Sequence, residues 1–241
     1  MRRMMRIPGR ICLAATVCLA TVTTWAEVPC RVPVRDSTRQ ISKYPHSWTE
    51  IKQRHVVMQE RDYSCGAAAL ATIARYYWGD QVTEETFLKL VDEVLTQEQI
   101  LDRIENGLTM ADLEKVAVKA GYDSVVGILD FPKLTESKIP LVVGITVNDF
   151  RHFVVYRGFD GYYVYLADPI RGNVRLPAEE FVQQWQKGAA LVIAQRGAEP
   201  KAWAPLMVSA REAALGSSNT QVIRTAPNRQ AVTLPYPFFR Q

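Results

Sequence analysis

One cysteine in this chain of 241 residues stands where a reactive thiol is expected. Cys65 lies in the stretch DYSCGAAALATIARYY, whose helix formers predict a helix with Ser64 as its N-cap. Unpaired backbone N–H groups and the positive end of the helix dipole in the first turn favour a thiolate. Because the thiolate is the nucleophilic form, this placement indicates a catalytic residue. Small residues also surround cysteines that are merely packed in cores, so the pattern alone leaves both interpretations open.

A nucleophilic cysteine needs a base, and the chain has three histidines. His46 and His55 lie before the cysteine, in a loop and beside the strand-like VVMQ, whereas His152 opens the apolar segment HFVVYRGF. Asp168, in YLADP, lies across an expected hairpin from His152, where a carboxylate would orient the imidazole. Both residues also have plainer interpretations, because histidines often begin strands and aspartates often open turns before proline.

Gln59 is the fourth candidate. It lies at the end of VVMQ, where the chain is expected to turn towards the helix that begins near Cys65. Its side-chain amide and the backbone N–H of Cys65 would form an oxyanion hole for the tetrahedral intermediate of acyl transfer. The order Gln, Cys, His, Asp, with helix before sheet, favours the catalytic interpretation.

The hairpin between His152 and Asp168 sets a geometric condition on this site. Asp160-Gly161 is a strong signal for a two-residue hairpin loop. A regular ladder from that loop would pair Phe153 with Asp168, so His152 and Asp168 would point to opposite faces of the sheet. The two side chains can therefore meet only if the ladder contains a one-residue bulge, if the loop is longer by one residue, or if Asp168 has already left the strand.

The elements that would position these residues change character along the chain. The first half predicts helices: one from Ser64 to a stop at Gly79, one capped by Thr83, and one with a Thr109/Asp112 capping box that ends at Gly121. The second half predicts strands, with the segments SVVGIL, PLVVGITV, HFVVYRGF and YYVYLAD. Helices followed by strands predict an α+β fold with an antiparallel sheet.

The two ends of the chain lack the regular hydrophobic pattern of the middle part. Four arginines, a short apolar run and Thr24-Trp25-Ala26 predict a cleavable signal peptide over residues 1–26 and export to the periplasm. We expect an extended arm over 27–55, a globular domain over 56–196 and a partly disordered tail over 197–241. Removing four of the 29 basic residues leaves 25 against 25 acidic residues, so no polyanionic partner is implied.

Cleavage would also remove two of the four cysteines and leave Cys30 and Cys65. In an oxidising compartment this pair could form a disulfide that masks the nucleophile. A free or modified Cys30 is the favoured alternative.

Two blocks of the sequence resemble those of a known family. MQERDYSCGAAALATIARYY and HFVVYRGFDGYYVYLADPIRG are similar to the signature blocks of the bacteriocin-processing peptidases, which are papain-like cysteine peptidases that cleave leader peptides after a double glycine. The resemblance covers Val56 to about Arg196. It implies a papain-like fold, no cofactor and no metal. It also implies the roles of four residues: Cys65 as nucleophile, His152 as base, Asp168 as orienting carboxylate and Gln59 as oxyanion donor.

The chain departs from typical family members in its context. Those members are cytosolic domains of ABC exporters, whereas this sequence has a predicted export signal and no Walker motif, which argues against ATP as a ligand. The balanced charge of the mature chain argues against nucleic acid. It looks similar to the exported, peptidase-like accessory proteins of functional-amyloid (fap) operons. That likeness implies amyloid subunits or secretion machinery as partners.

Three functions fit these observations. The first is a cysteine endopeptidase that hydrolyses a segment of an exported protein. The second is a peptidase-fold binding module, against which the intact set of four residues argues. The third is an acyltransferase in which an amine replaces water.

Overall fold

The computed structural model describes residues 32–35, 40–43, 46–210 and 212–213. It divides into two units, Met1–His46 and Ser47–Gln241. In the first unit, strands β1 (Val32–Arg35) and β2 (Gln40–Lys43) pair as an antiparallel ribbon. The predicted signal peptide, Cys30 and the aromatic end of the tail lie outside the described residues.

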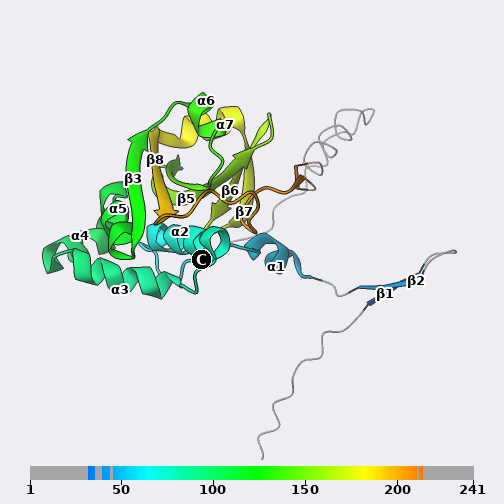
Figure 1. Cartoon of the computed structure of the whole chain (residues 1–241), viewed down its shortest axis with the longest axis horizontal. Helices are drawn as coiled ribbons and strands as arrows, with labels where there is room; N and C mark the ends of the chain where they lie inside the picture. Colours follow the sequence, from blue (N-terminus) through cyan, green and yellow to red (C-terminus); the bar gives the residue numbers. More distant parts are fainter. Residues whose placement is uncertain (1–31, 36–39, 44–45, 211, 214–241) are drawn as a thin grey trace, which may run out of the picture. The chain divides into compact units, whose positions relative to one another are not determined.

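The second unit begins with helices (Figure 1). They are α1 (Trp48–Gln53), α2 (Cys65–Ile73), which continues as the π-helical turn η1 (Ala74–Trp78), α3 (Glu84–Val94), α4 (Gln97–Asn106) and α5 (Met110–Lys119). Across the described residues, no helix is both long and apolar enough to cross a bilayer.

Six antiparallel strands follow in the order β3-β8-β4-β5-β6-β7. They are β3 (Tyr122–Ile128), β4 (Leu141–Val147), β5 (Phe150–Phe159), β6 (Tyr163–Asp168), β7 (Gly172–Pro177) and β8 (Trp185–Gln195), with α6 (Phe131–Thr135) and α7 (Ala178–Gln184) in the connections. The predicted α+β fold with an antiparallel sheet is confirmed.

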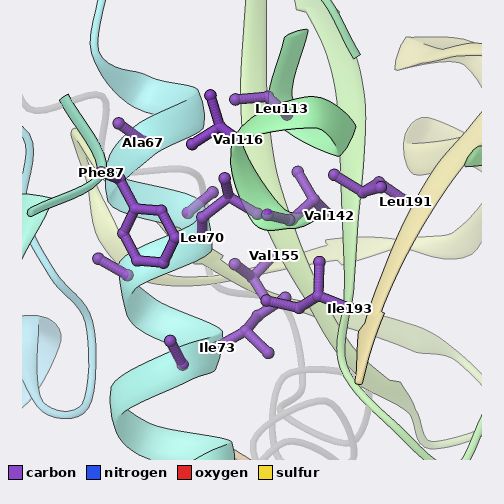
Figure 2. Packing of buried hydrophobic residues seen from close by; sticks show 14 of the residues in the cluster. Ala67, Leu70, Ile73, Phe87, Leu113, Val116, Val142, Val155, Leu191 and Ile193 are labelled. Carbon is purple, nitrogen blue, oxygen red and sulfur yellow. The ribbon is translucent and has the colours of Figure 1, made fainter. Parts of the chain in front are cut away.

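Apolar side chains bury both faces of this sheet. On one face, Figure 2 shows α2 side chains such as Leu70 and Ile73 among Val142, Val155 and Ile193 of the sheet. On the other face, α6 and α7 cover a second cluster of buried residues: Leu134, Phe181, Leu141, Val143, Ile145, Val154, Tyr156, Val164, Leu166 and Ala190. Burial of these apolar surfaces is the main stabilising contribution, and it fixes α2 against the centre of the sheet.

The helix termini follow the sequence closely. Thr83 and Thr109 each cap a helix through a reciprocal capping box, as predicted, and Gly79 ends the first long helix in a left-handed conformation. The prediction for Ser64 is only half right. Ser64 directly precedes α2, but its hydroxyl donates to the carbonyl oxygen of Arg61 at 2.7 Å and makes no capping bond.

The segment after Arg196 contributes to the same core within the described residues. Ala204 is almost fully buried and Leu206 is completely buried in the cluster that contains α2. The side chain of Lys201 donates to the carbonyl oxygen of Trp78 at 2.6 Å. The chain therefore returns to α2 and η1 after its last strand.

Candidate active site

Cys65 is the first residue of α2 and is buried as a free thiol. The first intrahelical bond runs from the Ala68 N–H to the Ser64 carbonyl at 3.0 Å, so the N–H of Cys65 belongs to the orphan donors of the first turn. Gly66 lies so close to Leu113 that a Cβ atom there would be 2.7 Å from one of its methyl carbons. The absence of a side chain at Gly66 thus lets α2 sit close to α5 directly beside the thiol.

His152 and Asp168 meet inside the protein. The imidazole Nε2 of His152 lies 2.9 Å from Oδ1 of Asp168, and the two side chains are 5% and 0% exposed. The other ring nitrogen, Nδ1, is buried and has no hydrogen-bond partner among the described residues. Because Cys65 and His152 line the same cleft and Nε2 is bonded to Asp168, Nδ1 is the nitrogen available to the thiol. The structure thus brings three of the four predicted residues together.

The Asp168 carboxylate is held by four donors. Its Oδ1 accepts from His152 and from the backbone N–H groups of Ile170 and Arg171, at 2.8 and 3.0 Å, while Oδ2 accepts from Nε of Arg171 at 2.6 Å. Asp168 therefore opens the turn before β7 and orients the imidazole at the same time. A completely buried carboxylate with this set of donors is stabilised in its charged form.

A β-bulge places His152 and Asp168 on one face of the sheet. Near the loop, Phe159 faces Val164, but beyond a register shift Tyr156 faces Leu166 and Val155 faces Ala167. The extra residue is Arg157. The second register continues to Val154 opposite Asp168, and because side chains alternate along the strand, His152 shares that face.

The predicted two-residue loop was misplaced, but the predicted condition is met. The Asp160 N–H bonds to the carbonyl oxygen of Tyr163 at 3.2 Å, so the tight loop is Gly161-Tyr162 and not Asp160-Gly161. Asp160 instead accepts hydrogen bonds from the N–H groups of Tyr162 and Tyr163. The one-residue bulge supplies the change of face that the loop does not.

Gln59 is anchored beside the turn that follows Asp168, since its backbone N–H donates to the carbonyl oxygen of Pro169 at 2.9 Å. Its amide nitrogen donates to the carbonyl oxygen of Arg61 at 3.0 Å, and its buried Oε1 has no partner among the described residues. No hydrogen bond within the described part of the chain joins Gln59 to Cys65. The amide retains a second N–H, so the oxyanion role stays a prediction.

A cleft of about 610 Å³ opens over the cysteine and the histidine. Residues from α5, β4 and β8 line it, and they include Met110, Gly144 and Ala189. In β8 the chain bulges at Gln186–Gly188, where Lys187 has a φ of 51° and Gln186 donates to the carbonyl oxygen of Ile145 at 2.7 Å. This bulge forms one wall of the cleft.

The charges of His152 and Asp168 are set by each other. Burial lowers the pKa of His152, but the hydrogen bond to Asp168 and the neighbouring Cys65 outweigh this effect and raise the pKa to about 9. Burial raises the pKa of Asp168, but bonds to His152 and Arg171 outweigh this effect and hold the pKa below its usual range. The favoured state is an imidazolium between a carboxylate and the thiol, which is the arrangement that supports a thiolate nucleophile.

These shifts predict how stability depends on pH. The pKa of His152 is higher in the folded state than the unfolded value of about 6.5, so its contribution is complete below about pH 6.5 and is lost as the pH rises towards 9. The pKa of Asp168 is lower in the folded state, so the contribution of Asp168 to stability is lost as the pH falls below about 4. In urea unfolding, the His152→Gln variant should lose more free energy of unfolding relative to wild type near pH 6 than near pH 9. A difference that does not change with pH would contradict the pairing.

Arg171 and the β8 bulge were missed by the sequence reasoning. For Arg171 a signal was present, because an aspartate that opens a turn places the residues two and three positions later against its carboxylate. Arg171 stands three positions after Asp168. For Gln186 and Lys187 we find no local signal, since a bulge inside a strand is set by the neighbouring strands.

Comparison with known proteins gives a consistent result. Residues 53–198 match the Peptidase C39 family. The probable functional amyloid protease FapD of Pseudomonas fluorescens is 36% identical over 146 residues, 60% of this chain and 63% of that protein. FapD of Pseudomonas aeruginosa is 30% identical over 64% of this chain and 67% of that protein. A solved double glycine motif protease of an AMS/PCAT transporter, in complex with the leader peptide, is 29% identical with a TM-score of 0.47, over 59% of this chain and 94% of that one.

Proposed function

We propose, on the premise that this chain belongs to the Peptidase C39 family, that it is an exported cysteine peptidase that cleaves a peptide or leader segment of another exported protein. One observation carries the proposal. Cys65 and His152 line the same cleft, and Asp168 holds the far nitrogen of the imidazole at 2.9 Å. A thiol, an imidazole and a carboxylate in this order form the apparatus of nucleophilic acyl transfer.

In the proposed reaction the Cys65 thiolate attacks a peptide carbonyl carbon and forms a carbon–sulfur bond. The oxyanion accepts hydrogen bonds from the backbone N–H of Cys65 and from the amide of Gln59. His152 gives its Nδ1 proton to the leaving amine as the carbon–nitrogen bond breaks, and a thioester remains. Water then attacks the thioester, His152 takes a proton from that water, and the acid product leaves with the thiolate restored. Asp168 keeps the Nε2–H of the imidazole in place throughout.

A peptide library tests this function on many candidate substrates at once. Purified protein is incubated with peptides prepared from a bacterial proteome, and new termini are identified by mass spectrometry. We expect cleavage at a shared sequence pattern and its loss after alkylation of Cys65. A protein that binds peptides yet produces no new termini would instead be a binding module.

The charges of the cleft predict a substrate preference. Apart from His152, the charged residues that line it in the described part of the chain are Arg103, Arg151 and Lys187. Arg103 is paired with Asp112 at 2.6 Å, whereas Arg151 and Lys187 are exposed and have no ion-pair partner among the described residues. Exposed pairs contribute up to about 1 kcal/mol, so an acidic residue in the substrate should lower KM by up to about fivefold.

Charge reversal checks this preference. Lys187→Glu should raise KM for acidic peptides while kcat stays near wild type, and added salt should reduce the difference. Lys89→Glu makes the same change on the exposed face of α3, away from the cleft, and should leave KM unchanged. Equal effects of the two variants would mean that the cleft has no charge preference.

Export and the substrate pathway are the finer parts of the proposal. The arginines, apolar run and Thr24-Trp25-Ala26 of the sequence support cleavage after Ala26. We expect the periplasmic fraction to contain a chain that begins at Glu27, and N-terminal sequencing checks this. The matched region spans less than two thirds of the Pseudomonas fluorescens relative, whose name links that protein to functional amyloid, and we propose a substrate in such a pathway.

A further inference from the structure

Arg157 is the extra residue of the bulge in β5, and its buried guanidinium group is hydrogen-bonded through all three of its nitrogens. Its side chain is 5% exposed. Nε donates to the carbonyl oxygen of Leu206 at 2.7 Å, and Nη1 donates to Oδ1 of Asn173 at 2.8 Å. Nη1 and Nη2 also bond the two carboxylate oxygens of Glu212 at 2.8 and 3.0 Å. Such a bidentate pair fixes the guanidinium in position as well as neutralising it.

Most of these partners come from one segment near the end of the described chain. We call residues 204–210 and 212–213 the clasp. The clasp lies beyond residues 53–198, the part that matches the peptidase family. Its Leu206 is fully buried, and its Val208 packs on the bulge, because a Cβ atom added to Gly158 would be 3.3 Å from a Val208 methyl carbon. The clasp therefore contacts both residues of the bulge, Arg157 and Gly158.

The hydrophobic pattern of β5 does not by itself fix where the bulge lies. Val154 and Tyr156 face one buried cluster and Val155 faces the other, and all three are at most 1% exposed. Register is strongly specified where one face of a strand is apolar and the other polar. In β5 a shift of one residue replaces one apolar side chain by another on each face, so a polar contact at the extra residue is what distinguishes the bulged register from the regular one.

The presence of the bulge between His152 and the loop decides whether His152 can reach Asp168. Without the shift, the register next to the loop would continue, Val155 would face Asp168, and His152 would point to the opposite face. We propose that the clasp acts as a positioning element, in which its contacts to Arg157 fix the bulge and thereby hold His152 against Asp168. The effect of the clasp on catalysis rests on the proposed function, whereas its effect on the contact between His152 and Asp168 does not.

The structural consequence can be measured without a substrate. The chain has three histidines, so NMR titration of the imidazole C–H signals resolves each of them. The titratable groups that face His152 are Cys65 from α2 and Asp168 from β6, with Arg171 behind Asp168. If the bulge is lost, His152 loses Asp168, and its pKa should fall from about 9 by more than one pH unit.

Arg157→Met is the main variant, and Arg175→Met is its matched control. Arg175 lies on β7 at the edge of the sheet, where it is exposed and stacks on Tyr163, so the control removes the same charge without touching the clasp. His55 serves as an internal reporter. Burial first, and then the charges of Arg54 and Arg157, lower the pKa of His55, so loss of the Arg157 charge should raise it even if the bulge stays in place.

We expect Arg157→Met to lower the pKa of His152, Arg157→Lys to restore part of the shift, and Arg175→Met to leave it at the wild-type value. If Arg157→Met does not fold, Glu212→Gln replaces it, because that change removes only the charge of a partly exposed clasp residue. A folded Arg157→Met or Glu212→Gln variant whose His152 titrates as in wild type would overturn the proposal.

The catalytic consequence is measured separately on a peptide that the wild-type protein cleaves. The clasp residues do not line the cleft, so kcat should fall by about tenfold to a hundredfold while KM stays constant. If the wild-type protein cleaves nothing, the proposed function fails while the titration still tests the clasp. If cleavage occurs and neither kcat nor the His152 titration changes in the variant, the clasp proposal fails alone.

Discussion

Cys65→Ala should abolish peptide hydrolysis, with a loss of roughly 10⁶-fold in kcat, as is found when the nucleophile of a catalytic triad is removed. The thiolate forms the bond that replaces the scissile amide, and the described part of the chain has no second cysteine to substitute for it. The loss should not reflect unfolding. Alanine is only slightly smaller than cysteine, and Cys65 lies beside Ala67, Ala68 and Ala69 at a helix start that tolerates alanine.

Rates of cleavage at saturating peptide, together with urea unfolding of both proteins, check this prediction. Cys65→Ser is the matched variant, because it keeps the shape and a hydroxyl but not an accessible anion, and it should be nearly as inactive. Hydrolysis by Cys65→Ala within tenfold of the wild-type rate would contradict a role for this thiol as nucleophile.

Asp168→Asn should lower kcat by about 10³ to 10⁴-fold. Asparagine keeps one oxygen to accept from the backbone N–H groups of Ile170 and Arg171, so the turn should persist. The amide nitrogen would then stand in place of Oδ2 and face the guanidinium of Arg171, which is also a donor. The amide oxygen would still accept from the imidazole, but a neutral amide no longer stabilises the positive charge of the imidazolium.

The pH profile should change together with the rate. In wild type the imidazolium persists to about pH 9 because Asp168 holds it, and in Asp168→Asn the pKa of His152 should move down towards the ordinary histidine value. Asp92→Asn makes the same change on the exposed face of α3 and should behave as wild type. A variant at Asp168 that retains the wild-type kcat and pH profile would exclude an orienting role for this carboxylate.

Local signals account for what the sequence predicted well. The caps at Thr83 and Thr109 depend on residues three positions apart, and both were predicted correctly because a capping box is closed within one turn. The strands β4, β5 and β6 are rich in β-branched and aromatic residues and were equally clear. The resemblance drawn from the two blocks around Cys65 and His152 is confirmed by the match over residues 53–198.

Non-local contacts account for what the sequence did not predict. β7 and β8 contain Gly172 and Lys187-Gly188, all with positive φ angles, so their composition does not indicate continuous strands. The position of the β5 bulge depends on Arg157 and on residues about fifty positions later, such as Leu206 and Glu212. No window of local sequence contains both partners.

The side chain of Ser64 illustrates competition between local bonds. The sequence predicted Ser64 as an N-cap. Its Oγ instead donates to the backbone carbonyl oxygen of Arg61 and accepts from the backbone N–H of Arg61. Serine side chains often bond to nearby backbone groups outside the helix. The helix still begins at Cys65, because α2 is fixed by its buried side chains and not by a cap.

The central claim is that the chemistry passes through an acyl group on Cys65, and partitioning with hydroxylamine tests it most directly. Hydroxylamine competes with water for a thioester whichever step limits the rate, so the experiment does not require the intermediate to accumulate. The account predicts that the N-terminal fragment of a cleaved peptide appears as its hydroxamate, in a share that rises with hydroxylamine concentration. If only the free acid appears at every concentration, water attacks the peptide directly and the account is wrong.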